Sequence, residues 1–266
     1  MTSYTKQNVC IWCGRSSKEA SFKTRPHTVP RGMRGQNIGV DICDECNHYF
    51  GTGDTLVTPH LCIEVCLKEI FVISQLLLSS NRPNAESYKN FKSSYFEYRH
   101  SKRVIRFKPA FNLNTLFLKT FFHQFKRGFY EIFLQEYHRC TGNGLDKRFD
   151  GIRRFARYNE GDMPIYYIPN NGIYLIDSDA IEHPDLRFSE YALNDIEQYG
   201  FYPAYFMGHR FYLAVTPKAY ETKDLYLQNE ANKLYEMSIV YPQIIELKSI
   251  TEFDFTLRTL YGDKSR

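Results

Sequence analysis

The chain has 266 residues and a formal net charge of +4, enough sequence for one large domain or two modest ones. Hydrophobic residues make up 43% and charged residues 24%, a globular composition that excludes a disordered chain. The first nine residues lack an apolar segment, and charges interrupt the most apolar stretches, so we expect neither a signal peptide nor a membrane span. These features predict a soluble, cytoplasmic protein that makes no membrane contact.

The charge is distributed unevenly along the chain. Residues 81–160 carry 17 Lys and Arg against seven Asp and Glu, a net charge of +10, whereas residues 161–266 carry nine against 16, a net charge of −7. A basic segment beside an acidic one predicts either a face that binds a polyanion or neutralisation of one part by the other within the fold.

Two identical Cys-x-x-Cys pairs open the chain: Cys10 with Cys13, and Cys43 with Cys46. This spacing is typical of zinc ribbons, in which four thiolates surround one ion at about 2.3 Å. We therefore expect one structural Zn²⁺ bound by these cysteines. Cys62 and Cys66, four residues apart on an apolar segment, are expected to pack in the core instead.

One histidine and one asparagine lie close to the cysteines in the sequence. His27 stands between two prolines, which disfavour helix and predict an extended strand. Asn47 directly follows Cys46, where a helix is expected to begin. Because zinc ties both segments, the two side chains can lie across a small cleft. An imidazole can take a proton from water, and an amide oxygen suits Mg²⁺ or Mn²⁺, so together they are the minimum for metal-assisted hydrolysis of a phosphodiester.

The order Cys-x-x-Cys, His-x-x-Pro, Gly, Cys-x-x-Cys-Asn-x-x-Phe-Gly over residues 8–52 resembles the zinc-ribbon HNH endonucleases of the ββα-metal superfamily. The resemblance implies that His27 is the general base that activates water and that Asn47 binds the catalytic divalent cation. It also implies that the four cysteines bind a structural zinc.

Two positions depart from the family pattern. Pro26 stands where the family usually has Asp or Glu as a second metal ligand. The asparagine that commonly orients the base has no counterpart at its usual place, and Asn37 or Asp41 could serve instead. Arg31 and Arg34, just after the base, suit phosphate oxygens through bidentate hydrogen bonds or are solvated loop charges.

Two helices are predicted in the middle of the chain. Residues 61–78 are expected to form a mostly buried helix. Residues 113–138 are expected to form a long amphipathic helix whose Phe-rich face packs in the core, with Thr115, Lys119, Lys126 and Gln135 turned away from it. Gly128 is expected to mark a close helix crossing.

Residues 79–108 interleave aromatic with basic side chains between these helices. Cations can contact phosphates while rings stack on bases, so the pattern fits a nucleic-acid surface. It fits a half-exposed strand pair equally well. The candidate nucleic-acid-binding residues are Arg99, Lys102, Arg103 and Arg106.

The part after residue 141 is predicted to mix strands and helices. Strand pairs are expected around an Asn-Gly turn at 165–176 and a Met-Gly turn at 202–215, further strands at 238–247 and 250–260, and a helix at 225–236.

The sequence thus predicts an α+β protein in three parts: a zinc-bound HNH module at residues 1–58, a helical, basic connecting region at 59–140 and an α+β domain at 141–266. The expected function is a DNA endonuclease with structural Zn²⁺ and catalytic Mg²⁺ or Mn²⁺. By analogy of layout it belongs among bacterial defence or mobile-element nucleases. The C-terminal domain is expected to select substrate or a protein partner.

Two alternatives to this function stay open. One is an RNA nuclease, because neither His27 nor Asn47 distinguishes the two nucleic acids. The other is a zinc-ribbon nucleic-acid-binding protein without hydrolysis, because Pro26 removes an expected metal ligand.

Overall fold

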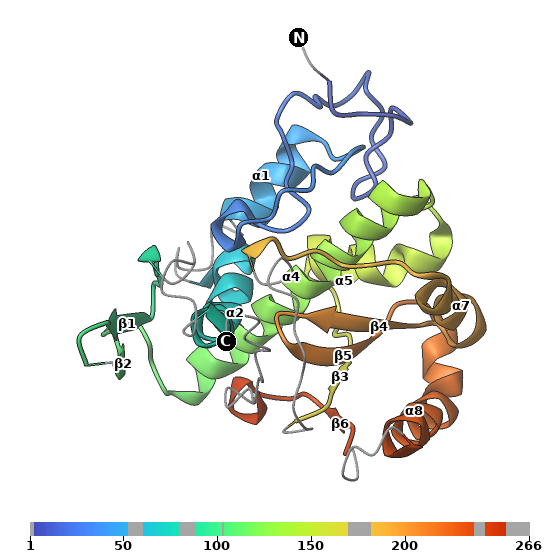
Figure 1. The fold of residues 1–266 in the computed structure, drawn as a ribbon. Helices are drawn as coiled ribbons and strands as arrows, with labels where there is room; N and C mark the ends of the chain where they lie inside the picture. The colour runs from blue at the N-terminus through green and yellow to red at the C-terminus, as the bar shows by residue number, and fades with distance from the viewer. Residues whose placement is uncertain are drawn as a thin grey trace, which may run out of the picture.

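The computed structural model describes residues 3–52, 61–79, 89–102, 104–169, 182–236 and 243–253. Within these ranges the fold contains six α-helices and two small antiparallel sheets, which confirms the predicted α+β class (Figure 1). No helix among the described residues combines the length and apolarity that a membrane span requires.

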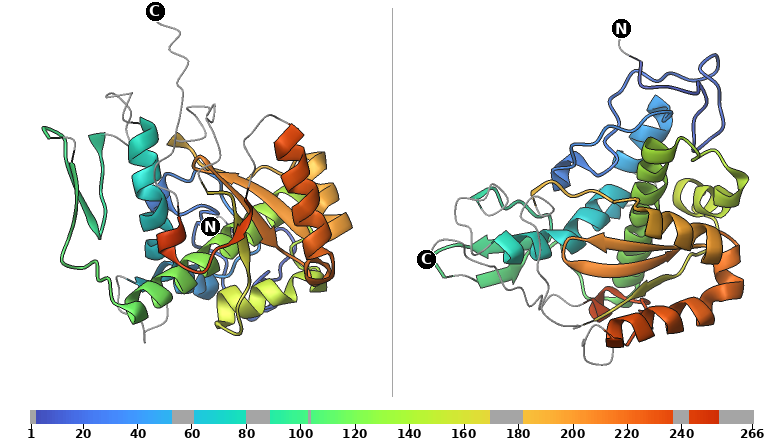
Figure 2. Two further views of the ribbon diagram at one scale, coloured as in Figure 1. Left: turned by 90° about the horizontal axis from the view of Figure 1, so that it is seen from below. Right: turned by 45° about the vertical axis from the view of Figure 1, so that its right-hand side comes forward.

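The longest helix, α4 (Thr115–Thr141), runs through the centre of the molecule (Figures 1 and 2). The side chain of Asn114 caps its first turn, and Gly142 ends it in the left-handed conformation at φ 77°. The helix predicted at 113–138 is confirmed, and two of its expected polar positions, Thr115 and Lys119, are exposed. The other two, Lys126 and Gln135, are buried, because neighbouring elements cover the later part of the helix.

Helix α2 (Ile63–Ser79) confirms the helix predicted at 61–78 and crosses α4 at Gly128. A Cβ at Gly128 would lie 3.0 Å from the Cβ of Leu67 and 3.1 Å from the Cγ2 of Ile63. The expected close crossing is therefore present, and any larger residue at position 128 would push against Leu67 and Ile63. Cys62 and Cys66 are buried in the core, as predicted.

The larger sheet has the strand order β4-β5-β3-β6, with every neighbouring pair antiparallel. Its strands are β3 (Ile165–Tyr167), β4 (Phe201–Phe206), β5 (His209–Ala214) and β6 (Ile245–Glu246). The predicted hairpin at 202–215 is confirmed, and Met207 and Gly208 turn it with positive φ. Phe206 and Phe211 of one face pack on Phe71 of α2, which joins the sheet to the central helices.

Helices α7 (Glu190–Tyr199) and α8 (Lys218–Glu236) pack beside this sheet. Tyr226 of α8 stacks on Phe201 of β4 with ring centroids 4.5 Å apart. The helix predicted at 225–236 is confirmed and starts earlier. Helix α7 was not predicted, and neither was α5 (Asp150–Tyr158), which follows the 3₁₀ turn η3 (Lys147–Phe149).

Two strand predictions near the C-terminal part turn out differently. A 3₁₀ turn, η4 (Ile250–Glu252), replaces the strand predicted from residue 250, because Ser249 and Glu252 form a reciprocal capping box. Residues 254–260 of that strand, and 170–176 of the predicted 165–176 pair, lie outside the described residues.

The smaller sheet is the hairpin of β1 (Phe96–Arg99) and β2 (Val104–Phe107), which stands apart from the larger sheet (Figures 1 and 2). The half-exposed strand pair expected within 79–108 is therefore present. The N-terminal residues lie at the opposite end of α4. One cluster of buried apolar side chains extends from Cys10 to Phe253; the division into three domains stays a prediction.

The helix crossing gives a matched test of packing. We expect Gly128→Leu to lower the free energy of unfolding by about 1–3 kcal/mol, because the new leucine side chain must displace Leu67 and Ile63. Gly151→Leu places the same side chain on α5, where a Cβ meets nothing within 4 Å, and should not destabilise the protein. Urea denaturation measures both, and equal midpoints would contradict the crossing.

Candidate metal centre and hydrolytic site

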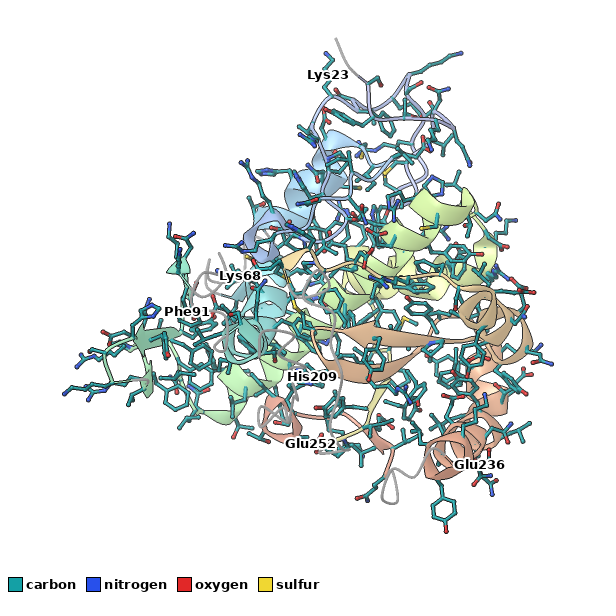
Figure 3. All side chains as sticks on the ribbon, viewed as in Figure 1. Lys23, Lys68, Phe91, His209, Glu236 and Glu252 are labelled. Atoms are coloured by element: carbon teal, nitrogen blue, oxygen red, sulfur yellow. The ribbon has the colours of Figure 1, made fainter. Side chains whose placement is uncertain are left out.

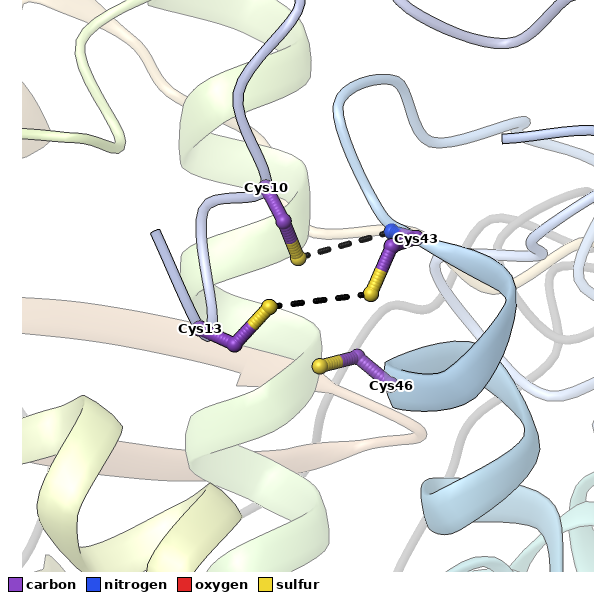
Figure 4. Close-up of side chains that lie close together, drawn as sticks. All are labelled: Cys10, Cys13, Cys43 and Cys46. Carbon is purple, nitrogen blue, oxygen red and sulfur yellow. Dashed lines mark hydrogen bonds between the residues drawn. The ribbon is translucent and has the colours of Figure 1, made fainter. Parts of the chain in front are cut away.

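The four cysteines of the two Cys-x-x-Cys pairs converge on one point (Figure 4). All four Sγ atoms lie within 4.8 Å of one another, and those of Cys13 and Cys43 are 3.7 Å apart. Tetrahedral coordination with bonds of about 2.3 Å places sulfurs about 3.8 Å apart, so this cluster can hold a zinc ion. The zinc-ribbon arrangement predicted from the spacing is consistent with this geometry.

Local backbone structure prepares both knuckles. In the first, the Gly14 N–H donates to the Cys10 carbonyl at 2.9 Å, and Gly14 takes φ 71°, which favours glycine. The second opens helix α1 (Asp44–Thr52), where the Asn47 N–H donates to the Cys43 carbonyl at 2.9 Å. The helix therefore begins at Asp44, earlier than the expected start after Cys46, and it carries Asn47 in its first turn.

Two arginines donate to the thiolates of this centre. The Nε of Arg15 lies 3.3 Å from the Sγ of Cys13, and the Nε of Arg157 lies 3.3 Å from the Sγ of Cys46. With one Zn²⁺ bound, four thiolates would carry a net charge of −2, and the two guanidinium groups would offset part of this charge while they also pair with Glu45. Because Arg157 belongs to α5, 111 residues after Cys46, no local pattern in the sequence indicates its role.

Arg157 is itself held by further contacts. Its guanidinium lies 4.0 Å from the centroid of the Tyr49 ring and pairs with Glu45 at 3.4 Å. Arg153, one turn earlier on α5, donates from Nε to the Ile11 carbonyl at 2.6 Å. Helix α5 therefore contacts both Cys-x-x-Cys pairs, through Arg153 at the first pair and Arg157 at the second.

His27 lies on the extended segment that the sequence predicted. It forms an antiparallel bridge with Ile38, flanked by hydrogen bonds from the Gly39 N–H to the Pro26 carbonyl at 2.8 Å and from the Thr28 N–H to the Asn37 carbonyl at 3.1 Å. The 3₁₀ turn η1 (Arg31–Met33) lies between the paired segments, and α1 follows them.

The start of α1 is fastened to the chain that leads to His27. The Asp44 carboxylate accepts hydrogen bonds from the Lys23 and Thr24 N–H groups, both at 2.8 Å. One turn later the Asn47 Nδ2 donates to the Thr24 Oγ1 at 3.2 Å. The fold thus brings Asn47 beside the segment three residues before His27. The Asn47 Oδ1 accepts no hydrogen bond from any residue in the described ranges.

The surroundings of His27 favour its neutral form. Partial burial, together with the positive charges of Arg25 and Arg31, lowers the pKa of the imidazole below its ordinary value of 6.5. The ring is therefore unprotonated at pH 7 and able to accept a proton.

The two residues considered for orienting His27 serve another purpose. The Asn37 Nδ2 donates to Glu136 at 3.1 Å, and the Asp41 carboxylate accepts from the backbone of Lys6 at 2.8 Å and pairs with His138 at 3.0 Å. These contacts fasten the His27 segment and the N-terminal loop to α4.

The arginines and lysines predicted to bind nucleic acid are spread over two surfaces. Arg31 is exposed on η1, and Arg34 pairs with Glu182 at 3.0 Å. Arg99 pairs with Glu97 at 3.3 Å on β1, whereas Lys102 and Arg106 of the β1–β2 hairpin are exposed. Arg103 lies outside the described residues.

Comparisons of the chain with protein-family models, with curated proteins and with solved structures give no match.

The thiolate contacts of Arg157 lead to a prediction about metal retention. Arg157→Met should weaken zinc binding by about 10- to 100-fold, because it removes a charge-neutralising hydrogen bond to Cys46. Arg154→Met, on the same helix without a contact to the cysteines, is the matched control. Competition with a chromogenic chelator measures both affinities, and equal zinc retention would contradict a role for Arg157.

Proposed function

We propose that the protein is a metal-dependent endonuclease that hydrolyses DNA phosphodiester bonds, with His27 as general base and Asn47 as a ligand of the catalytic cation. The observation that carries the proposal is the hydrogen bond of Asn47 to Thr24, three residues before His27. This hydrogen bond joins helix α1, which contains Cys46 and Asn47, to the segment that leads to His27. The lowered pKa of His27 keeps its imidazole neutral at pH 7.

The chemistry assigned to these groups is in-line hydrolysis. The His27 imidazole accepts a proton from a water molecule, whose oxygen attacks phosphorus, and the bond from phosphorus to the leaving oxygen breaks. A bound Mg²⁺ or Mn²⁺ polarises the phosphoryl oxygens and stabilises the leaving oxygen. The Asn47 Oδ1 suits such a hard cation, whereas the four thiolates suit zinc.

A basic hairpin supports nucleic acid as the substrate. Segment 89–108, with Arg103 counted from the sequence, carries seven Lys and Arg against one acidic residue, Glu97. Side chains with nitrogen ends extend outwards from this hairpin (Figure 3), and the residue Phe107 is 65% exposed. Exposed cations suit a phosphate backbone, and an exposed ring suits stacking on a base.

A second function is favoured by one observation, the proline at position 26. Without an acidic residue beside His27, the same zinc-bound scaffold suits a nucleic-acid-binding protein that does not hydrolyse its ligand. RNA as the substrate is a further alternative, because a 2′-hydroxyl makes no difference to the proposed roles. In each case the C-terminal part is proposed to select the substrate or a partner.

Plasmid cleavage with Mg²⁺ or Mn²⁺, and with EDTA as a blank, separates enzyme from binder. His27→Ala should reduce cleavage by about 10²- to 10⁴-fold while zinc content and DNA affinity stay unchanged, because only the proton acceptor is removed. His48→Ala, an exposed neighbour on α1, should cleave like wild type. The wild-type rate should rise with pH through a midpoint below 6.5 and then level off. Wild-type cleavage by His27→Ala would contradict the nuclease assignment.

The role of the hairpin can be tested through salt dependence. Lys102→Glu with Arg106→Glu should flatten the plot of log affinity for DNA against log salt by about 0.9 for each phosphate that the hairpin no longer neutralises. Lys218→Glu with Lys223→Glu makes the same charge change on α8 and should leave the slope as in wild type. Fluorescence anisotropy on labelled DNA measures both, and identical slopes would assign the hairpin charges another role.

A further inference from the structure

Asn47 stands at the end of a short chain of hydrogen bonds that starts at Asp44. The Thr24 hydroxyl oxygen lies 2.7 Å from the Asp44 Oδ1, which also accepts from the Lys23 and Thr24 N–H groups, both at 2.8 Å. The Asn47 Nδ2 in turn lies 3.2 Å from the Thr24 Oγ1. The side chains of Asp44, Thr24 and Asn47 are therefore linked in that order.

The chemistry of these groups dictates the direction of each hydrogen bond. An aspartate carboxylate is ionised at pH 7 and can only accept, so the Thr24 hydroxyl gives its one proton to Asp44. Toward Asn47 the hydroxyl oxygen can then only accept, which requires the amide nitrogen on that side. The reversed amide would set two acceptor oxygens against each other. The hydrogen bonds thus select one of the two orientations that the shape of an amide allows.

The selected orientation decides which atom Asn47 can offer to a cation. With the Nδ2 at Thr24, the Oδ1 lies on the other side of the planar amide, where no residue in the described part of the chain donates to it. Mg²⁺ and Mn²⁺ bind the oxygen of an amide and not its nitrogen, whose lone pair is delocalised. A reversed Asn47 would therefore present no ligand atom on this side.

The Thr24 hydroxyl is not needed to hold the two segments together. The Asp44 N–H donates to the Ser21 carbonyl at 2.7 Å, and the Asp44 carboxylate binds the N–H groups of Lys23 and Thr24. All of these bonds remain possible when the hydroxyl is removed. The particular contribution of the hydroxyl is therefore the orientation of the Asn47 amide.

We propose that Thr24, itself oriented by Asp44, is a positioning residue that presents the Asn47 Oδ1 to the catalytic cation. The inference rests on the proposed function, in which Asn47 is a ligand of Mg²⁺ or Mn²⁺. It couples the two halves of the proposed site, because the segment that leads to the proton acceptor His27 also orients the metal ligand.

Titration of the full-length, zinc-loaded protein with Mn²⁺ tests the positioning role. Paramagnetic broadening of the backbone amide NMR signal of residue 47 reports binding at this site alone. Thr24→Val keeps the shape of the side chain without the hydroxyl and should weaken Mn²⁺ binding by about two- to tenfold, a moderate loss because water can partly replace the hydroxyl. Thr24→Ser keeps the hydroxyl and should bind Mn²⁺ like wild type.

Asn47→Asp separates positioning from general damage to the fold. A carboxylate presents an oxygen in either orientation, so Thr24→Val should change Mn²⁺ affinity by less than about twofold in this background. Local damage would instead weaken binding by the same factor in both backgrounds, and that result would overturn the inference. Wild-type Mn²⁺ affinity of Thr24→Val with Asn47 in place would overturn it as well.

The positioning role and the nuclease can fail separately. If Thr24→Val weakens Mn²⁺ binding as expected but the wild type cleaves neither DNA nor RNA, the positioning role stands and the proposed function is wrong. If cleavage requires His27 and Asn47 but Thr24→Val binds Mn²⁺ and cleaves like wild type, the proposed function stands and the positioning role is wrong. A wild type that binds no Mn²⁺ at residue 47 would contradict both.

Discussion

From residue 121 to residue 138 helix α4 is almost entirely buried, so water does not solvate the polar side chains of this part and they need partners within the protein. Several of these partners belong to the N-terminal half of the molecule. Glu136 accepts from Thr28 and from the Asn37 Nδ2, while His138 pairs with Asp41. These bonds fix the segment that carries His27 against α4 and leave the imidazole on the other side of the strand from Thr28.

Helix α4 fixes α1 and α5 in the same way. The buried guanidinium of Arg127 donates to the Ala156 carbonyl of α5 at 2.9 Å and also binds the hydroxyl of Tyr49 on α1. Tyr49 in turn lies under Arg157, which reaches the cysteine centre. The polar side chains of α4 thus add directional hydrogen bonds to its apolar packing, and such satisfied buried networks help to specify one arrangement of the helices.

Local patterns in the sequence predicted the local parts of this structure. The cysteine spacing, the helices at 61–78 and 113–138, the hairpin at 202–215 and the extended segment at His27 each depend on residues close in the chain. For the same reason Asn47 was expected at the start of a helix, and α1, which begins at Asp44, carries it in its first turn. The roles of His27 and Asn47 stay predictions, because position alone does not test chemistry.

What the sequence could not predict depends on contacts between distant segments. Helical periodicity turned Lys126 away from the Phe-rich face, but the side chain is buried and pairs with Asp162, 36 residues later. In the sequence Arg157 is one of many basic residues in segment 81–160, and only the fold places its guanidinium beside Cys46. The β-rich composition of 250–260 favoured a strand, whereas the cap formed by Ser249 and Glu252 selects a turn at its start.

The contact of Arg157 with the cysteine centre has a thermodynamic consequence for the chain as a whole. Arg157 finds a strong acceptor in Cys46 only while the sulfur is a thiolate, and a bound metal is what keeps a buried thiol deprotonated. The apolar cluster that contains Cys10 and Cys46 continues without a break to Phe253. A zinc ion bound at the cysteines would therefore couple metal affinity to folding through α5 and the shared core, and it would stabilise residues that it does not touch.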